Sequence, residues 1–115
     1  MKHARASELL DRLPGPVSTK WPQGERFAAA LANGTMSVEL YAPRGTDPQT
    51  PHAQDELYFV HSGTATFTLE NERIACAAGD ALFVPAGAEH RFTDFSDDFA
   101  TWVVFWGPQG GEGAA

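Results

Sequence analysis

Apolar and polar residues alternate along most of the chain, which is the pattern of half-buried β-strands. Phe27, Ala29 and Leu31 occupy alternate positions, and so do Met36, Val38 and Leu40. The pair Asn33-Gly34 stands between the two runs. Because Asn and Gly both tolerate a positive φ angle, this arrangement predicts a β-hairpin. The run Ala28-Ala29-Ala30 would also suit a helix, but the hairpin context favours a strand.

Six further short strands are predicted beyond this hairpin. They cover residues 56–61, 64–69, 73–76, 81–84, 90–95 and 99–106, and turn-forming residues separate most of them. A single short helix is predicted over residues 6–13, where Ser7 can cap its start and Pro14-Gly15 ends it. About eight short antiparallel strands with one helix predict an all-β sandwich or small barrel.

A chain of 115 residues is long enough for one domain. Three parts are expected within it. Residues 1–24 form the N-terminal helix and a linker, residues 25–107 form the β-barrel, and residues 108–115 form a flexible tail. The tail is expected because its small residues offer no anchor.

Charge and composition exclude some classes of partner. The net charge of −7 argues against nucleic acid, because phosphates require basic residues. No apolar run approaches the ~20 residues that span a membrane, and no apolar leader follows the N-terminus, so a cytoplasmic protein is expected. Cys76 is the only cysteine, which excludes an intrachain disulfide and favours a small buried side chain.

Two histidines and one glutamate are the candidate metal ligands. Alternate residues of a strand share a face, so His52, Gln54, Glu56 and Tyr58 have the same parity. If the segment that begins at His90 lies beside them, His52, Glu56 and His90 can reach one ion. Imidazole nitrogen and carboxylate oxygen suit divalent transition metals, and Zn, Ni, Fe and Mn are not distinguishable by this pattern.

Two motifs in the chain resemble those of the cupin superfamily, in its small single-domain, cupin 2 type. The first motif is matched by His52, by Glu56 with three residues between them, and by Gly63 with six residues between it and Glu56. The second motif is matched at its spacings by Gly79, Pro85, Gly87 and His90. The resemblance implies a double-stranded β-helix, or jelly-roll barrel, with a metal site inside.

The chain departs from the family pattern at three positions. The family's first histidine falls at Thr50, Gly45 lies one residue too close, and Asp94 replaces the final asparagine. Three outcomes stay open. The site can be a two-His-one-carboxylate triad with open positions, Gln54 can supply a fourth ligand, or the site can hold no metal, as a hydrogen-bonded cluster.

Parity also predicts a pocket and an outer face. Tyr58, Phe92, Trp102 and Val104 are expected to line a ligand pocket. Leu57, Phe59, Val103 and Phe105 are expected on the other face, together with an exposed His61. The N-terminal helix is expected to cover part of that face and a second subunit the rest, which predicts a homodimer.

Two functions fit these features. The first is a metal-dependent enzyme acting on a small oxygenated or acidic molecule, in a dioxygenase, isomerase or lyase class that the residues do not resolve. No catalytic residue beyond the ligands is identified. The alternative is a non-catalytic barrel that binds a small ligand without turnover, since a fold alone does not define a function.

Overall fold

The computed structural model describes residues 1–113, which form one helix and eight strands. Their bounds are α1 Ala6–Asp11, β1 Phe27–Asn33, β2 Met36–Tyr41, β3 Asp55–Ser62, β4 Thr64–Leu69, β5 Glu72–Ala77, β6 Ala81–Val84, β7 His90–Thr93 and β8 Ala100–Trp106. No helix in this part of the chain is long and apolar enough to cross a membrane.

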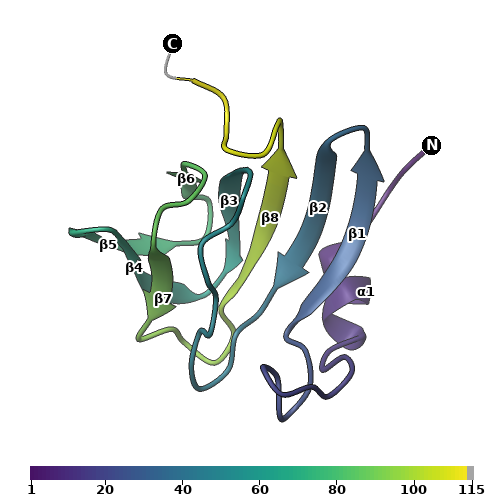
Figure 1. Ribbon diagram of the computed structural model, residues 1–115. Coiled ribbons are helices and arrows are strands. Elements are labelled where there is room, and N and C mark those ends of the chain that lie inside the picture. The colour runs from purple at the N-terminus through teal and green to yellow at the C-terminus, as the bar shows by residue number, and fades with distance from the viewer. Residues whose placement is uncertain (114–115) are drawn as a thin grey trace.

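The strands form two antiparallel sheets that face each other (Figure 1). The large sheet has the order β1-β2-β8-β3-β6, and the small sheet has the order β5-β4-β7. Helix α1 packs beside β1 and β2, on the side of the large sheet away from the small one (Figure 1). The predicted all-β jelly-roll barrel with a short N-terminal helix is therefore confirmed.

The predicted hairpin joins β1 and β2. Asn33 pairs with Met36, so the two residues of the turn are Gly34 and Thr35, one position later than expected. Gly34 has a φ angle of 59°, a value that glycine adopts without steric cost. The hairpin places β2 next to β8 and so extends the large sheet.

The two faces of the large sheet belong to different hydrophobic clusters. The inner face, with Tyr58, Val60 and Val103, packs against residues of the small sheet such as Phe67 and Phe92. The outer face carries a second cluster around Leu9 of α1, Ala28 and Leu40. The interior between the sheets is thus largely filled by side chains, as in other small barrels.

The prediction for β8 assigned the wrong faces. Val103 lies opposite Tyr58, and Phe105 lies opposite Glu56, so both point inward. Trp102 packs against the outer cluster beside α1, and Val104 shares that outer face. Trp102 and Val104 therefore do not line an inner pocket. Strand β8 is apolar on both faces, so its sequence shows no apolar–polar alternation that would indicate which side faces the interior.

The segment after β8 is tied to the barrel, contrary to the expected unanchored tail. The N–H of Gly110 donates to the carbonyl of Ala53 at 2.7 Å, and the N–H of Glu112 donates to Asp55 Oδ2 at 3.0 Å. Asp55 lies on the outer side of β3, away from Glu56, as its parity predicts. Residues 114 and 115 of the predicted tail lie outside the described residues.

Candidate metal centre

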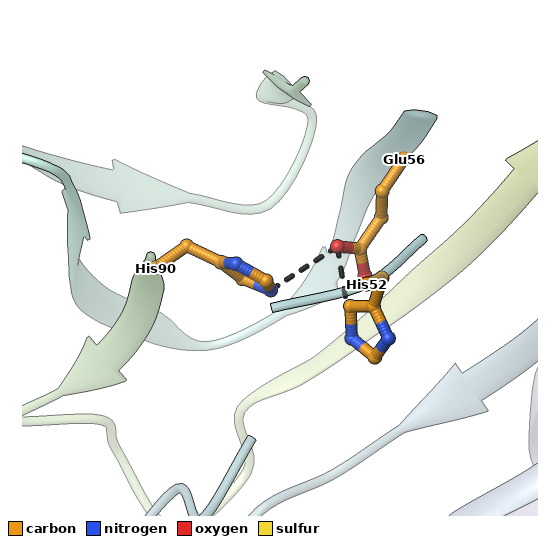
Figure 2. Close-up of side chains that lie close together, drawn as sticks. All are labelled: His52, Glu56 and His90. Carbon is orange, nitrogen blue, oxygen red and sulfur yellow. Dashed lines mark ion pairs between the residues drawn. The ribbon is translucent and has the colours of Figure 1, made fainter. Parts of the chain in front are cut away.

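Two sheets and a loop bring His52, Glu56 and His90 together (Figure 2). Glu56 belongs to β3 of the large sheet, His90 begins β7 of the small sheet, and His52 lies in the loop before β3. Glu56 Oε1 is 3.1 Å from His90 Nε2 and 3.9 Å from His52 Nε2. One ligand atom from each residue lies within 4.8 Å of the others, a spacing at which they could hold one ion.

Burial distinguishes the three side chains. The side chains of Glu56 and His90 are fully buried, whereas that of His52 keeps 32% of its surface exposed. The His52 ring packs edge-on against Phe105, with ring centroids 4.7 Å apart. Solvent therefore reaches the cluster from the His52 side, while Glu56 and His90 form its closed inner end.

Hydrogen bonding leaves the inner end of the cluster unsatisfied. His90 Nδ1 donates its proton to the carbonyl of Ala88 at 2.9 Å, which directs the Nε2 lone pair of a neutral ring towards Glu56. Neither oxygen of Glu56 nor His90 Nε2 has a hydrogen-bond partner among the described residues. Two acceptors that face each other at 3.1 Å require a cation between them, either a proton or a metal ion.

The two imidazoles differ in their affinity for a proton. Burial lowers the pKa of His52, against the attraction of the Glu56 carboxylate, and the nearby His90 lowers it further. Burial also lowers the pKa of His90, but its contact with Glu56 and its bond to Ala88 outweigh burial and raise the pKa overall. His52 is thus the readier of the two to offer a neutral nitrogen, the form that binds metals.

Gln49 and Asp47 are two residues of this region that the sequence patterns did not single out. Gln49 Oε1 lies 3.4 Å from His52 Nε2 and accepts the Tyr58 hydroxyl proton at 3.1 Å. Asp47 is buried and accepts from the Gln49 side chain at 3.0 Å. Both lie in an irregular loop, where strand parity gives no information. The only available signal was that Gln49 directly precedes Thr50, the position of the family's first histidine.

The remaining candidates lie at different distances from the cluster. Tyr58 and Phe92 are fully buried on the inner side, where their rings pack edge-on at 4.9 Å between centroids. Gln54 donates instead to the carbonyls of Thr35 and Gly107. Within the described range, residues 1–113, Gln54 makes no hydrogen bond or ion pair with His52, Glu56 or His90. Its role as a ligand therefore stays a prediction.

Two other predictions concern side chains remote from the centre. His61 is exposed on β3, as its parity indicated. Cys76 is buried within the inner cluster, and burial raises the pKa of its thiol, which disfavours the reactive thiolate. Both observations agree with the structural roles expected for these residues.

Two hollows border the centre. One, of about 480 Å³, is lined by residues that include Gln49, Thr50 and His90. The other, of about 460 Å³, is lined by residues that include His52, Gln54 and Phe105. A small molecule in the second hollow would lie against the exposed side of His52.

Residues 37–106 match the cupin domain family. An uncharacterised protein of Streptomyces coelicolor is 47% identical over 81 residues, which cover 69% of this chain and 77% of that protein. Among solved structures, a cupin 2 conserved barrel domain protein from Salinispora arenicola has a TM-score of 0.65 at 20% identity, and 85% of each chain is covered. A candidate mannose-6-phosphate isomerase from Ralstonia eutropha has a TM-score of 0.61 at 25% identity, with 82% of this chain and 92% of that chain covered. The match over 37–106 includes Glu56, Gly63 and the whole second motif, and the chain therefore belongs to the cupin family.

Proposed function

We propose that the barrel binds a divalent transition-metal ion through His52, Glu56 and His90. One observation carries this proposal: the buried oxygens of Glu56 and the buried His90 Nε2 face each other without hydrogen-bond partners. A carboxylate buried this deeply needs a positive charge beside it, and a bound metal ion would supply that charge as a proton on His90 does. His52 adds a second nitrogen on the solvent side, which a shared proton alone does not require.

The proposed activity is chemistry on a small oxygenated or acidic molecule. A divalent ion held by two neutral imidazoles and one carboxylate keeps a net positive charge, and such an ion polarises a bound oxygen atom. The hollow beside His52 offers room for a small molecule next to the open side of the cluster. Dioxygenase, isomerase and lyase classes are all compatible with this arrangement, and the Ralstonia eutropha relative bears the name of an isomerase candidate.

The chain's own residues would orient the donors and exclude water. The Ala88 carbonyl holds the His90 ring by its Nδ1 proton, so that Nε2 faces inward. Phe105 packs against one side of the His52 ring. Tyr58 directs its hydroxyl to Gln49, and burial together with the charge of Glu56 raises its pKa far above the usual value, so it stays a neutral donor.

Elemental analysis of the purified protein tests the metal proposal. We expect about one transition-metal ion per chain in the wild type and a loss of that ion in His90→Ala, because the variant removes one of three ligands. His61→Ala is the matched control. His61 lies on the same strand as Glu56, but it is exposed and has the opposite parity. This variant should keep the metal content of the wild type.

Absence of metal from the wild type, even after incubation with Fe, Mn, Ni and Zn salts, would contradict the proposal. The better account would then be a barrel that binds a small ligand without a metal and without turnover. Equal metal loss in His61→Ala and His90→Ala would also contradict it, because the ion would then be bound at the surface.

We further propose a homodimer formed through the outer face of β3 and β6. Phe59 and Phe83 are 46% and 51% exposed there, beside the region that α1 covers. Exposed aromatic side chains on a sheet face are typical of interfaces between protein chains.

A further inference from the structure

We infer that the side-chain oxygen of Gln49 is a fourth ligand of the ion proposed above. This inference rests on the proposed metal site, but it adds a donor that the family pattern does not supply at this position. The chain has Thr50 where the family has its first histidine, and Thr50 is exposed. Gln49, one residue earlier, is half-buried and turned towards the cluster.

The orientation of the Gln49 carboxamide is determined by its neighbours. Its Nε2 donates to Asp47 Oδ2 at 3.0 Å. An ionised carboxylate can only accept hydrogen bonds, and of the two amide groups only the NH₂ group can donate one. The amide therefore has its NH₂ group on the Asp47 side and its oxygen on the His52 side. The Tyr58 hydroxyl, which donates to that oxygen at 3.1 Å, supports the same assignment.

Asp47 makes this orientation rigid. The carboxylate is buried and also accepts from the Tyr41 hydroxyl at 2.6 Å and from the N–H of Phe92 at 2.9 Å. It additionally accepts from the backbone N–H of Gln49 at 3.2 Å. Because Phe92 lies on β7, two residues from His90, Asp47 fixes the Gln49 loop to the strand that carries a ligand.

Two pairs of donor atoms have spacings that fit a shared ion. Two donors bound at about 2.1 Å lie roughly 3.0 Å apart at a right angle and roughly 3.4 Å apart at a tetrahedral angle. Gln49 Oε1 lies 3.4 Å from His52 Nε2, and Glu56 Oε1 lies 3.1 Å from His90 Nε2. Gln49 and His90 also line the same hollow. The four donors thus form a set of two nitrogens and two oxygens.

The oxygen of Gln49 has capacity for this role. A carbonyl oxygen carries two lone pairs, and Tyr58 occupies only one of them. At 3.4 Å the contact with His52 is too long to be a strong hydrogen bond. The second lone pair is therefore free to bind a cation without breaking the contact with Tyr58.

Copper(II) bound to the purified protein provides a direct test. We expect electron paramagnetic resonance of the wild type to show hyperfine splitting from two nitrogens, those of His52 and His90. Gln49→His places an imidazole nitrogen at about the reach of the lost oxygen, so it should add a third nitrogen. Ile74→His is the matched control, and it should leave two because Ile74 is 57% exposed on β5, away from the cluster.

A second variant measures affinity instead of spectra. Gln49→Leu removes the oxygen and keeps an apolar side chain, and we expect cobalt(II) to bind roughly 10- to 100-fold more weakly. Thr50→Ala should bind as tightly as the wild type. Circular dichroism of each metal-free variant establishes that it is folded before binding is compared.

Two results would overturn the inference while leaving the three-residue site intact. One is a wild type that binds copper with two nitrogens and a Gln49→His variant that shows the same two. The other is a Gln49→Leu variant with unchanged cobalt affinity. A wild type that binds neither metal would overturn both this inference and the proposed function.

Discussion

At the scale of single residues, Glu56 and His90 form the buried inner end of the candidate metal centre. Each is fully buried, and each presents a lone pair to the other. The bond from His90 Nδ1 to the Ala88 carbonyl determines which nitrogen faces inward. Because two lone pairs face each other, a proton or a metal ion must lie between them. Removing one partner of such a buried pair would leave an uncompensated polar group.

A second carboxyl group, that of Glu39, also points to the inner side. Glu39 lies opposite Val103 on β8, and therefore on the same face as Tyr58. Burial raises its pKa to about 7, with smaller contributions from the charges of Glu56 and Glu25. This half-buried carboxyl makes the stability of the metal-free protein depend on pH.

We predict that Glu39→Gln stabilises the metal-free protein at pH 8 and leaves its stability at pH 4 unchanged. The folded state holds the Glu39 proton more tightly than the unfolded chain, whose carboxyl has a pKa of 4.5. The contribution of the protonated Glu39 carboxyl to the free energy of unfolding is therefore fully present below pH 4.5. It is lost as the pH rises from 4.5 to about 7. The gain should be on the order of 2 kcal/mol, because solvent screens part of the effect.

Urea unfolding of the two proteins across this pH range measures the effect. Glu72→Gln serves as the control, since it removes the same charge at an exposed position at the start of β5, and Glu39→Gln should show the larger gain at pH 8. A constant difference between Glu39→Gln and the wild type from pH 4 to pH 8 would refute the predicted titration.

At the scale of elements, the connection from β3 to β4 depends on one glycine. Gly63 has a φ angle of 74°, and a Cβ atom there would lie 2.4 Å from Ser96 Oγ and 2.7 Å from the Phe99 backbone. The chain can therefore pass from the large sheet to the small sheet only where no side chain intrudes. This packing gives a physical reason for a glycine at the end of the first motif.

We predict that Gly63→Ala lowers the free energy of unfolding by roughly 3 kcal/mol, through backbone strain and overpacking together. Gly79→Ala is a matched control. Gly79 also has a positive φ angle, 96°, but a Cβ atom there meets nothing within 4 Å. It should cost only the strain, roughly 1 to 2 kcal/mol. Chemical denaturation compares the two, and equal losses would show that contact with Phe99 does not matter.

At the scale of the whole molecule, the outer face of the large sheet is covered over only part of its area. Helix α1 covers the region around Leu40 and Trp102. The region formed by Phe59 and Phe83 stays exposed, and β6 beneath it is the end strand of the sheet. An exposed aromatic region at a sheet edge favours association with a second chain.

We predict that the protein is a dimer in solution and that Phe83→Glu shifts it towards the monomer. A charge in the centre of an apolar interface is costly to desolvate, so dissociation should increase at least tenfold. Size-exclusion chromatography with light scattering gives the mass. Val17→Glu is the control, because Val17 is 71% exposed in the linker, away from β6. A monomeric wild type would reject the proposed interface.

Local sequence patterns were sufficient to predict the strands and the cluster of His52, Glu56 and His90. Alternation and turn residues located the hairpin and the later strands within a few positions, because each depends on neighbours in the sequence. The spacing of the two motifs identified His52, Glu56 and His90, and the structure brings these residues together. Fixed spacing works here because Glu56 lies near the start of β3 and His90 starts β7, and the fold places these two strands in facing sheets.

Only the tertiary structure decided which face of β8 is inside, how the C-terminal segment is held, and where Gln49 points. Strand β8 is apolar on both sides, so the side that faces the small sheet depends on its register with β3. The segment near Glu112 is held by Asp55, which lies 57 positions away. The orientation of Gln49 depends on Asp47 and Tyr58, whose contacts form only when a loop and two sheets meet. Such long-range contacts leave no periodic trace in a sequence, since their partners are brought together by the fold rather than by spacing along the chain.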